Sequence, residues 1–364
     1  MPTRADLYGI VEEYTALGQH RTGTPVDWAT AEWMADHLGR RGLAVELEPM
    51  TFGQWTATST LTADGEPVDH LPVFYEFEGS VTTNAPELVA LDPMSGGFPG
   101  VLDEPVAAAQ ERGVDALVVA TEHPSGSLVA INRMPGAGSG LATVLVAGRD
   151  HTRLEAADEV ALRIEANEVD GRTSTVVGQR GDGHRPLVVS TPLTGWFGCA
   201  GERATGIAVL LDLLDRLSHV PVLVVATTGH EIGQLGVERW VGNLDPAAIR
   251  GIVHLGASIA VIDDTGELAA TRVAMTTVDG SVADSMTAAL ASARLDLVAG
   301  ATSWIGEAEA FARVGTPLLS FSGAGTDFHT PEDLPHRATS PEALDTAADA
   351  VASAVTHFVA SLEA

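Results

Sequence analysis

The opening of the chain has the spacing of two amphipathic helices. Apolar side chains recur three and four positions apart over residues 4–17 and again over residues 27–41, and Gly42 stands just beyond the second stretch, where a helix commonly ends. Residues 43–48 then alternate between apolar and acidic side chains, which predicts a half-buried strand. Helices followed by a strand are typical of an α/β domain.

The pattern changes between residues 64 and 172. A helix is predicted over residues 104–112, and a stretch rich in glycine, proline and serine covers residues 124–140. We therefore expect a small β-rich lobe at residues 64–172, inserted into the α/β domain and covering its crevice. Short apolar runs predict strands of this insert at residues 71–77, 88–91, 116–121 and 143–147.

The α/β pattern resumes after residue 172. The valine-rich run at residues 220–227 is continuously apolar, as in a strand buried within a parallel sheet. The predicted fold is therefore α/β, with a mainly parallel mixed sheet flanked by helices, formed by residues 1–63 and 173–364. The other predicted elements are strands at residues 187–190 and 316–321 and helices at residues 204–217, 236–241, 281–292 and 341–362.

Composition narrows the range of functions. Hydrophobic residues make up 45% of the 364 residues and charged residues 19%, a balance typical of a globular protein. The formal net charge is −29, and the chain has no lysine, which excludes a lysine Schiff base and a P-loop lysine. A surface this negative repels nucleic acid and anionic lipid, so neither is an expected partner.

Localisation is predicted from three absences in the sequence. There is no apolar run of the roughly 18 residues that a membrane helix needs, and the first ten residues lack an apolar signal region. Cys199 is the only cysteine, so an internal disulfide cannot form. We therefore expect a cytoplasmic protein without a membrane partner, and its assembly into a homo-oligomer remains open.

Polar loops follow three of the predicted strands, and each carries a side chain able to bind a metal: Glu202, Glu231 and His329. Open α/β sheets bind ligands at the carboxyl ends of their strands, so we expect these side chains to converge. Two carboxylates and an imidazole with one open position suit a catalytic zinc. Each residue also has a structural interpretation, Glu202 as an acid favoured at a helix start and His329 as a hydrogen-bonded loop histidine.

The motifs around these residues resemble those of the clan MH zinc exopeptidases, which include aminopeptidases and glutaminyl cyclases. The resemblance covers nearly the whole chain, since the insert is similar to the protease-associated domain of some members, and it implies the zinc-exopeptidase fold. The family motifs Asp-Asn-x-Ser-Gly, Glu-Glu-x-Gly-x-x-Gly, Asp-His-x-x-Phe-x-x-x-Gly-x-Pro and His-Thr-x-x-Asp correspond in order to the segments beginning at Glu202, His230, Glu307 and His329.

The resemblance departs where the family binds two metals. Thr191-Pro-Leu193 stands in place of the family's His-x-Asp, and Gly256 lies near the position of another aspartate ligand. The resemblance therefore implies at most one zinc and not a two-metal site. As in glutaminyl cyclases, which use an Asp/Glu/His trio, its ligands would be Glu202, Glu231 and His329.

Residue 230 marks a further departure, because the family's general base is a glutamate there. In this chain the position is His230, and imidazole, with an ordinary pKa of about 6.5, can also accept a proton at neutral pH. The catalytic candidates are His230, Glu231 and Glu202. The candidates for contacting the substrate are Arg203, Glu307, Trp196 and Thr191, and Arg203 and Arg272 are candidate clamps for a carboxylate.

These residues indicate an amide or peptide hydrolase with an altered site, acting on an amino-acid-like or small peptide substrate. One alternative is a cyclase similar to the single-zinc glutaminyl cyclases, and another is a non-catalytic binding protein that has lost the metal. A third makes Cys199 a nucleophile near a helix start, although its apolar neighbours and Glu202 oppose a thiolate.

Overall fold

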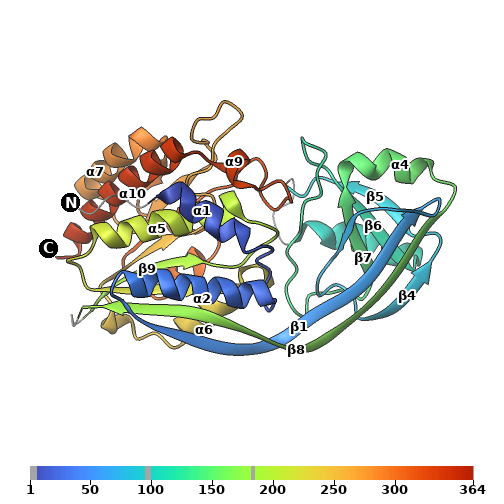
Figure 1. Ribbon diagram of the computed structural model, residues 1–364, viewed down its shortest axis with the longest axis horizontal. Helices are drawn as coiled ribbons and strands as arrows, with labels where there is room; N and C mark the ends of the chain where they lie inside the picture. Colours follow the sequence, from blue (N-terminus) through green and yellow to red (C-terminus); the bar gives the residue numbers. More distant parts are fainter. Residues whose placement is uncertain (1–5, 95–99, 182–184, 364) are drawn as a thin grey trace.

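The computed structural model describes residues 6–94, 100–181 and 185–363, which form two lobes joined by a pair of very long strands (Figure 1). The larger lobe contains the first and last helices and a large sheet flanked by helices, so the predicted α/β class is confirmed. The smaller lobe contains a second sheet. None of the helices in the described part of the chain combines the length and apolarity needed to cross a membrane.

Four parallel strands form the centre of the large sheet. They are buried on both faces, which explains why their sequences are almost continuously apolar. β14, β9 and β10 were predicted, whereas the short strands β11, β12 and β13 were not. Beginning at the far edge, the strands are β13 (Asp296–Val298), β12 (Val273–Thr276), β14 (Leu318–Ser322), β11 (Gly251–Leu255), β9 (Leu187–Pro192) and β10 (Val222–Thr227).

Helices cover both faces of this sheet, most of them on one side (Figure 1). Their starts follow from sequence, since Thr24 and Ser340 cap helices whose first residue is proline. The more heavily covered face carries α1 (Leu7–Ala16), α2 (Pro25–Arg40), α5 (Thr205–Arg216), α7 (Gly280–Leu290) and α10 (Pro341–Ser361), and the other carries α6 (Leu235–Gly242) and α8 (Ala308–Ala312). The short α9 (Pro335–Ala338) precedes α10.

β1 (Ala44–Ala63) and β8 (Val160–Arg180) form a long antiparallel ribbon that runs from one lobe into the other. The strand predicted at residues 43–48 therefore continues much farther. The alternation is interrupted at residues 49–54 and resumes over residues 55–63, where Trp55, Leu61 and Ala63 pack into the core of the smaller lobe. Near the end of β8, residues 176–180 pair with β10, so the ribbon is continuous with the large sheet.

The second sheet lies within residues 64–172, the range predicted for the insert. In the ribbon, β1 ends just before this range and β8 runs past its end at residue 172. The expected strand at residues 71–77 is shorter than predicted, because Tyr75 adopts a positive φ of 62° and the chain turns there. The second sheet consists of β3 (His70–Pro72), β7 (Ala142–Ala147), β6 (Ala116–Thr121) and β5 (Glu87–Leu91). The other elements of the lobe are β2 (Glu66–Pro67), β4 (Gly79–Thr83), α3 (Asp103–Arg112) and α4 (His151–Ala156).

A buried histidine joins α1 to α2. The ring of His20 stacks on Tyr14 with 3.7 Å between centroids, its Nε2 donates to the Tyr14 carbonyl and its Nδ1 accepts from the Thr30 hydroxyl. Burial lowers the pKa of His20 to about 3, so the ring is neutral in the folded protein.

We predict that His20 makes the fold sensitive to acid. As the pH falls from about 6.5 towards 3, the unfolded chain protonates this imidazole and the folded chain does not, so stability is lost in that window. His20→Gln has no imidazole to titrate at this position. The free energy of unfolding of the wild type minus that of His20→Gln, measured in urea titrations, should therefore become smaller between about pH 7 and pH 4.5. His357→Gln, on the exposed face of α10, is the control, and a gap that stays constant for His20→Gln would contradict the prediction.

Candidate active site

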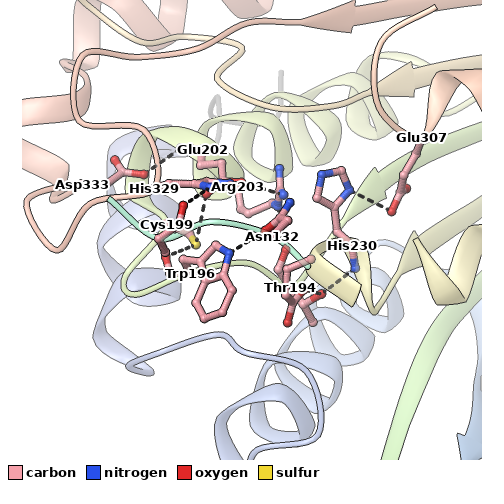
Figure 2. Close-up of polar contacts among 12 residues, drawn as sticks. Asn132, Thr194, Trp196, Cys199, Glu202, Arg203, His230, Glu307, His329 and Asp333 are labelled. Carbon is pink, nitrogen blue, oxygen red and sulfur yellow. Dashed lines mark hydrogen bonds and ion pairs between the residues drawn. The ribbon is translucent and has the colours of Figure 1, made fainter. Parts of the chain in front are cut away.

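Three loops meet at the carboxyl ends of the parallel strands, and their polar side chains lie close together (Figure 2). The loop after β9 enters a π-helical turn at Ala200–Ala204, η4 (His230–Ile232) follows β10, and His329 lies in the loop after β14. Neighbouring parallel strands end at the same edge of a sheet, which explains this gathering.

The carboxylate of Glu202 is buried, with 1% of the residue exposed, and three side chains contact it, the Cys199 thiol among them with Sγ 3.7 Å from Oε2. Arg203 Nη2 lies 2.7 Å from Glu202 Oε1, and His329 Nε2 lies 3.1 Å from the same oxygen. Burial alone would raise the pKa of Glu202, but the charge of Arg203 and the contact with His329 lower it to about 2. Glu202 is therefore an ionised carboxylate with its counter-charge already beside it.

Arg203 is fully buried beneath the loops. Its Nε donates to the Thr194 carbonyl at 2.7 Å, and its Nη2 forms the ion pair with Glu202. Arg203 was expected to contact the substrate, but in this structure the guanidinium faces inward and has no exposed surface. Its role here is electrostatic.

Asp333 fixes the backbone of the π-helical turn. Its carboxylate accepts hydrogen bonds from Gly201 N at 2.6 Å and from Glu202 N at 3.0 Å. Burial raises the pKa of Asp333 to about 7, although these two hydrogen bonds oppose the shift. The loop after β14 therefore supports Glu202 twice, through His329 and through Asp333.

Glu231 points to a different set of partners. Its Oε1 accepts from Thr22 N at 2.6 Å and its Oε2 accepts from the Thr194 hydroxyl at 2.9 Å. The Thr194 hydroxyl also accepts from Gly229 N at 2.9 Å and from His230 N at 3.3 Å (Figure 2). Glu231 and Thr194 therefore hold the loop after β10 against the N-terminal segment.

His230 and Glu307 form the second ion pair of the site. His230 Nδ1 lies 3.3 Å from Glu307 Oε1, and Thr227 donates to Glu307 Oε2 at 2.7 Å. Burial raises the pKa of Glu307, but the hydrogen bond from His230 and its charge outweigh burial, so the pKa lies below its usual range. Because an ionised carboxylate can only accept, Nδ1 donates to it and the lone pair of neutral His230 lies on Nε2.

A cleft of about 310 Å³ opens beside this pair, and its lining combines His230, His254 and Glu307 with apolar side chains that include Ile305 and Phe328. The side chain of His230 is 18% exposed, whereas Glu307 is fully buried behind it. Burial lowers the pKa of His254 to about 4, so this ring is neutral. The cleft therefore presents one accessible imidazole, held by a buried carboxylate, to a bound molecule.

The predicted zinc ligands do not form a metal site in this structure. In the described residues no three His, Cys, Asp or Glu side chains are grouped as a metal ion requires. Glu202 is paired with Arg203, and both oxygens of Glu231 are bound by Thr22 and Thr194. Three zinc ligands need free donor atoms, each about 2 Å from the position of the ion. The side chains in this structure therefore do not fit zinc.

Trp196 and Thr191, two expected substrate contacts, are both buried. Trp196 donates from its indole to Asn132 Oδ1 at 2.6 Å and packs against Phe74, so it connects the main lobe to the insert. The Thr191 hydroxyl has no hydrogen-bond partner among the described residues.

The thiol of Cys199 is fully buried, and burial raises its pKa well above the usual value. This environment opposes a nucleophilic role. Arg272 is buried as well, and it donates to the carbonyls of Ala269, Ile259 and Ala293 instead of facing the cleft. Burial lowers the pKa of Arg272 to about 10.

The insert completes the site. His329 Nδ1 lies 3.0 Å from the Ala130 carbonyl, and Ala130 N donates to the His329 carbonyl at 2.8 Å. No site role was expected for Thr194, His254 or the segment around Ala130 and Asn132. Only His254 carries a sequence signal, as a polar residue that interrupts the apolar strand at Gly251–Leu255.

No family model matches the sequence, and no curated protein matches it significantly. Solved structures match over almost the entire chain. A zinc aminopeptidase from Bacillus subtilis has a TM-score of 0.76 at 17% identity, covering 97% of this chain and 94% of its own. A peptidase M28 precursor from Shewanella amazonensis has a TM-score of 0.71 at 16% identity, covering 96% and 91%. A glutaminyl cyclase from Porphyromonas gingivalis has a TM-score of 0.51 at 11% identity, covering 98% and 97%. The chain therefore has the zinc-exopeptidase fold.

Proposed function

We propose that the protein hydrolyses an amide bond in an amino-acid-like or small peptide substrate, with His230 as the general base. The observation that carries this proposal is the His230–Glu307 pair at the side of the cleft, with the imidazole accessible and the carboxylate buried. In catalytic His–carboxylate pairs, the histidine accepts a proton and the carboxylate fixes the tautomer of the imidazole.

The reaction would use the chain's own groups in two steps. His230 Nε2 takes a proton from a water molecule as that water attacks the amide carbonyl, and Glu307 stabilises the resulting imidazolium. The imidazolium then returns the proton to the leaving amine. No step is assigned to a metal, because the side chains present do not fit one. Ile305 and Phe328 supply the apolar wall against which a substrate side chain would pack.

The solved structures of this fold support amide chemistry through their names, which include an aminopeptidase, a peptidase and a glutaminyl cyclase. The same base could serve a cyclase, in which an amine of the substrate replaces water as the attacking group. Products distinguish the two reactions, since hydrolysis of an amide consumes water and cyclisation does not.

A non-catalytic binding protein is the second candidate, and the Glu202–Arg203 pair favours it. This pair closes the centre of the site with an internal salt bridge of fully buried groups. In that case the cleft beside His230 would bind an amide-containing molecule without converting it.

We predict that His230→Ala and Glu307→Gln each lower kcat by roughly 10²-fold or more. Alanine removes the base, and glutamine presents an amide to Nδ1 in place of an ionised acceptor. The purified protein would be screened with aminoacyl amides, N-acyl amino acids and peptides with N-terminal glutamine, and the variants compared on the best substrate. His357→Ala, which changes an exposed histidine far along α10, is the matched control.

Two results would decide against this reaction. Unchanged turnover in both variants would remove His230 from the chemistry. Saturable binding of such amides without turnover would support the second candidate instead.

We predict that Thr194 positions His230. Thr194→Val keeps the shape but leaves one Glu231 oxygen and the amides of Gly229 and His230 without this partner. The buried groups should lose about 1–3 kcal/mol of stability, and kcat should fall with little change in KM. Thr194→Ser should restore both quantities, and Thr302→Val at an exposed position should change neither. Equal kcat in the valine and serine variants would show that the hydroxyl does not position the base.

A further inference from the structure

The centre of the site contains a buried pair of opposite charges. Arg203 is among the largest fully buried side chains of the protein, although arginine is almost never fully buried unless it is paired. Its ion-pair partner is the equally buried Glu202, in the segment that resembles the family's metal-binding helix start.

Local geometry explains how two adjacent residues both point inward. In a regular α-helix, neighbouring side chains project about 100° apart and rarely share one buried point. Ala200–Ala204 forms a π-helical turn instead, entered through Cys199 with a positive φ of 48°. π-helical turns are often found at functional sites. Within this turn, Arg203 Nη2 lies 2.7 Å from Glu202 Oε1.

The charges around Arg203 favour a cation, although Nη1 and Nη2 make no hydrogen bond with the described residues and Nη2 is held by the ion pair alone. The Thr194 carbonyl accepts from Arg203 Nε at 2.7 Å, and the charges of Glu202 and Glu307 raise the pKa of Arg203 although burial acts in the opposite direction. His254 Nε2 lies 3.3 Å from where a Cβ on Gly256 would be, so an imidazole fills the space beside that position. A divalent ion here would meet a guanidinium that cannot lose its proton.

We propose that the Arg203 guanidinium takes the place of the metal ion in this site, neutralising Glu202 and holding the loops after β9 and β14 together without zinc. This goes beyond the proposed reaction, and its test needs no substrate. It also gives a physical reason why the ligands expected from the sequence do not assemble: the carboxylate that would bridge to a metal is already bound to an internal cation.

The test is a double-mutant comparison of thermal unfolding in the full chain. Arg203→Met leaves the buried Glu202 carboxylate without its counter-charge and should lower Tm by roughly 5–15 °C. Glu202→Gln leaves the guanidinium unpaired and should also lower Tm. The double variant buries neither charge, so its Tm should be no lower than that of the less stable single variant.

Arg272→Met is the matched control, because Arg272 is also buried but donates to backbone carbonyls. Its loss of Tm should add to that of Glu202→Gln. Metal analysis of the purified wild type should find less than 0.1 zinc per chain, and EDTA should leave Tm unchanged. These wild-type measurements remain decisive even if Arg203→Met does not fold.

Three results would each overturn the inference. The first is a content of about one zinc per chain in the wild type, and the second is a drop in the Tm of the wild type on chelation. The third is a Tm loss in the Arg203→Met and Glu202→Gln double variant equal to the sum of the two single losses. Absence of amide turnover would leave the inference intact, so its failure is distinguishable from failure of the proposed function.

Discussion

The buried ion pair between Glu202 and Arg203 is the constraint on which the candidate site depends. Removing two charges from water is costly, and the cost is recovered only when the geometry is good and the remaining polar atoms are bound. Here Thr194, in the same loop as the pair, binds the guanidinium, while His329 and Asp333, in the loop after β14, bind the carboxylate and the backbone of the turn. Arg203 Nη1 has no hydrogen-bond partner among the described residues, so the geometry recovers only part of this cost. The loops after β9 and β14 are therefore positioned by the same charges.

The second lobe takes part in this arrangement instead of merely lying beside it. His329, which contacts Glu202, also exchanges hydrogen bonds with Ala130, and Trp196 reaches Asn132. The β1–β8 ribbon sets how far apart the lobes lie, but these contacts set how the insert meets the site. Loosening them would free one side of the His329 ring and so weaken the support of the central carboxylate.

Sequence reasoning succeeded where one periodicity holds over a whole element. The helices at both ends of the chain and strands such as β10 keep one burial pattern throughout, and the order of the polar loops identified the sheet edge. It failed at β1, where burial changes from one lobe to the next. It also failed for the partners of the site residues, because neighbours such as Glu202 and Arg203 are expected to diverge on a regular helix, whereas in this structure both point inward from a π-helical turn.

The polar groups around the cleft are relevant to whether the protein catalyses a reaction there. Buried polar groups lower stability unless they are hydrogen-bonded. A pocket that performs no reaction is therefore more stable when it is lined by apolar side chains. In this protein Glu307 is instead held by both Thr227 and His230, and His230 still reaches the surface of the cleft. A buried carboxylate that only stabilised the fold would not need an exposed imidazole as its partner. The exposure of His230 is therefore the observation on which the proposed reaction depends.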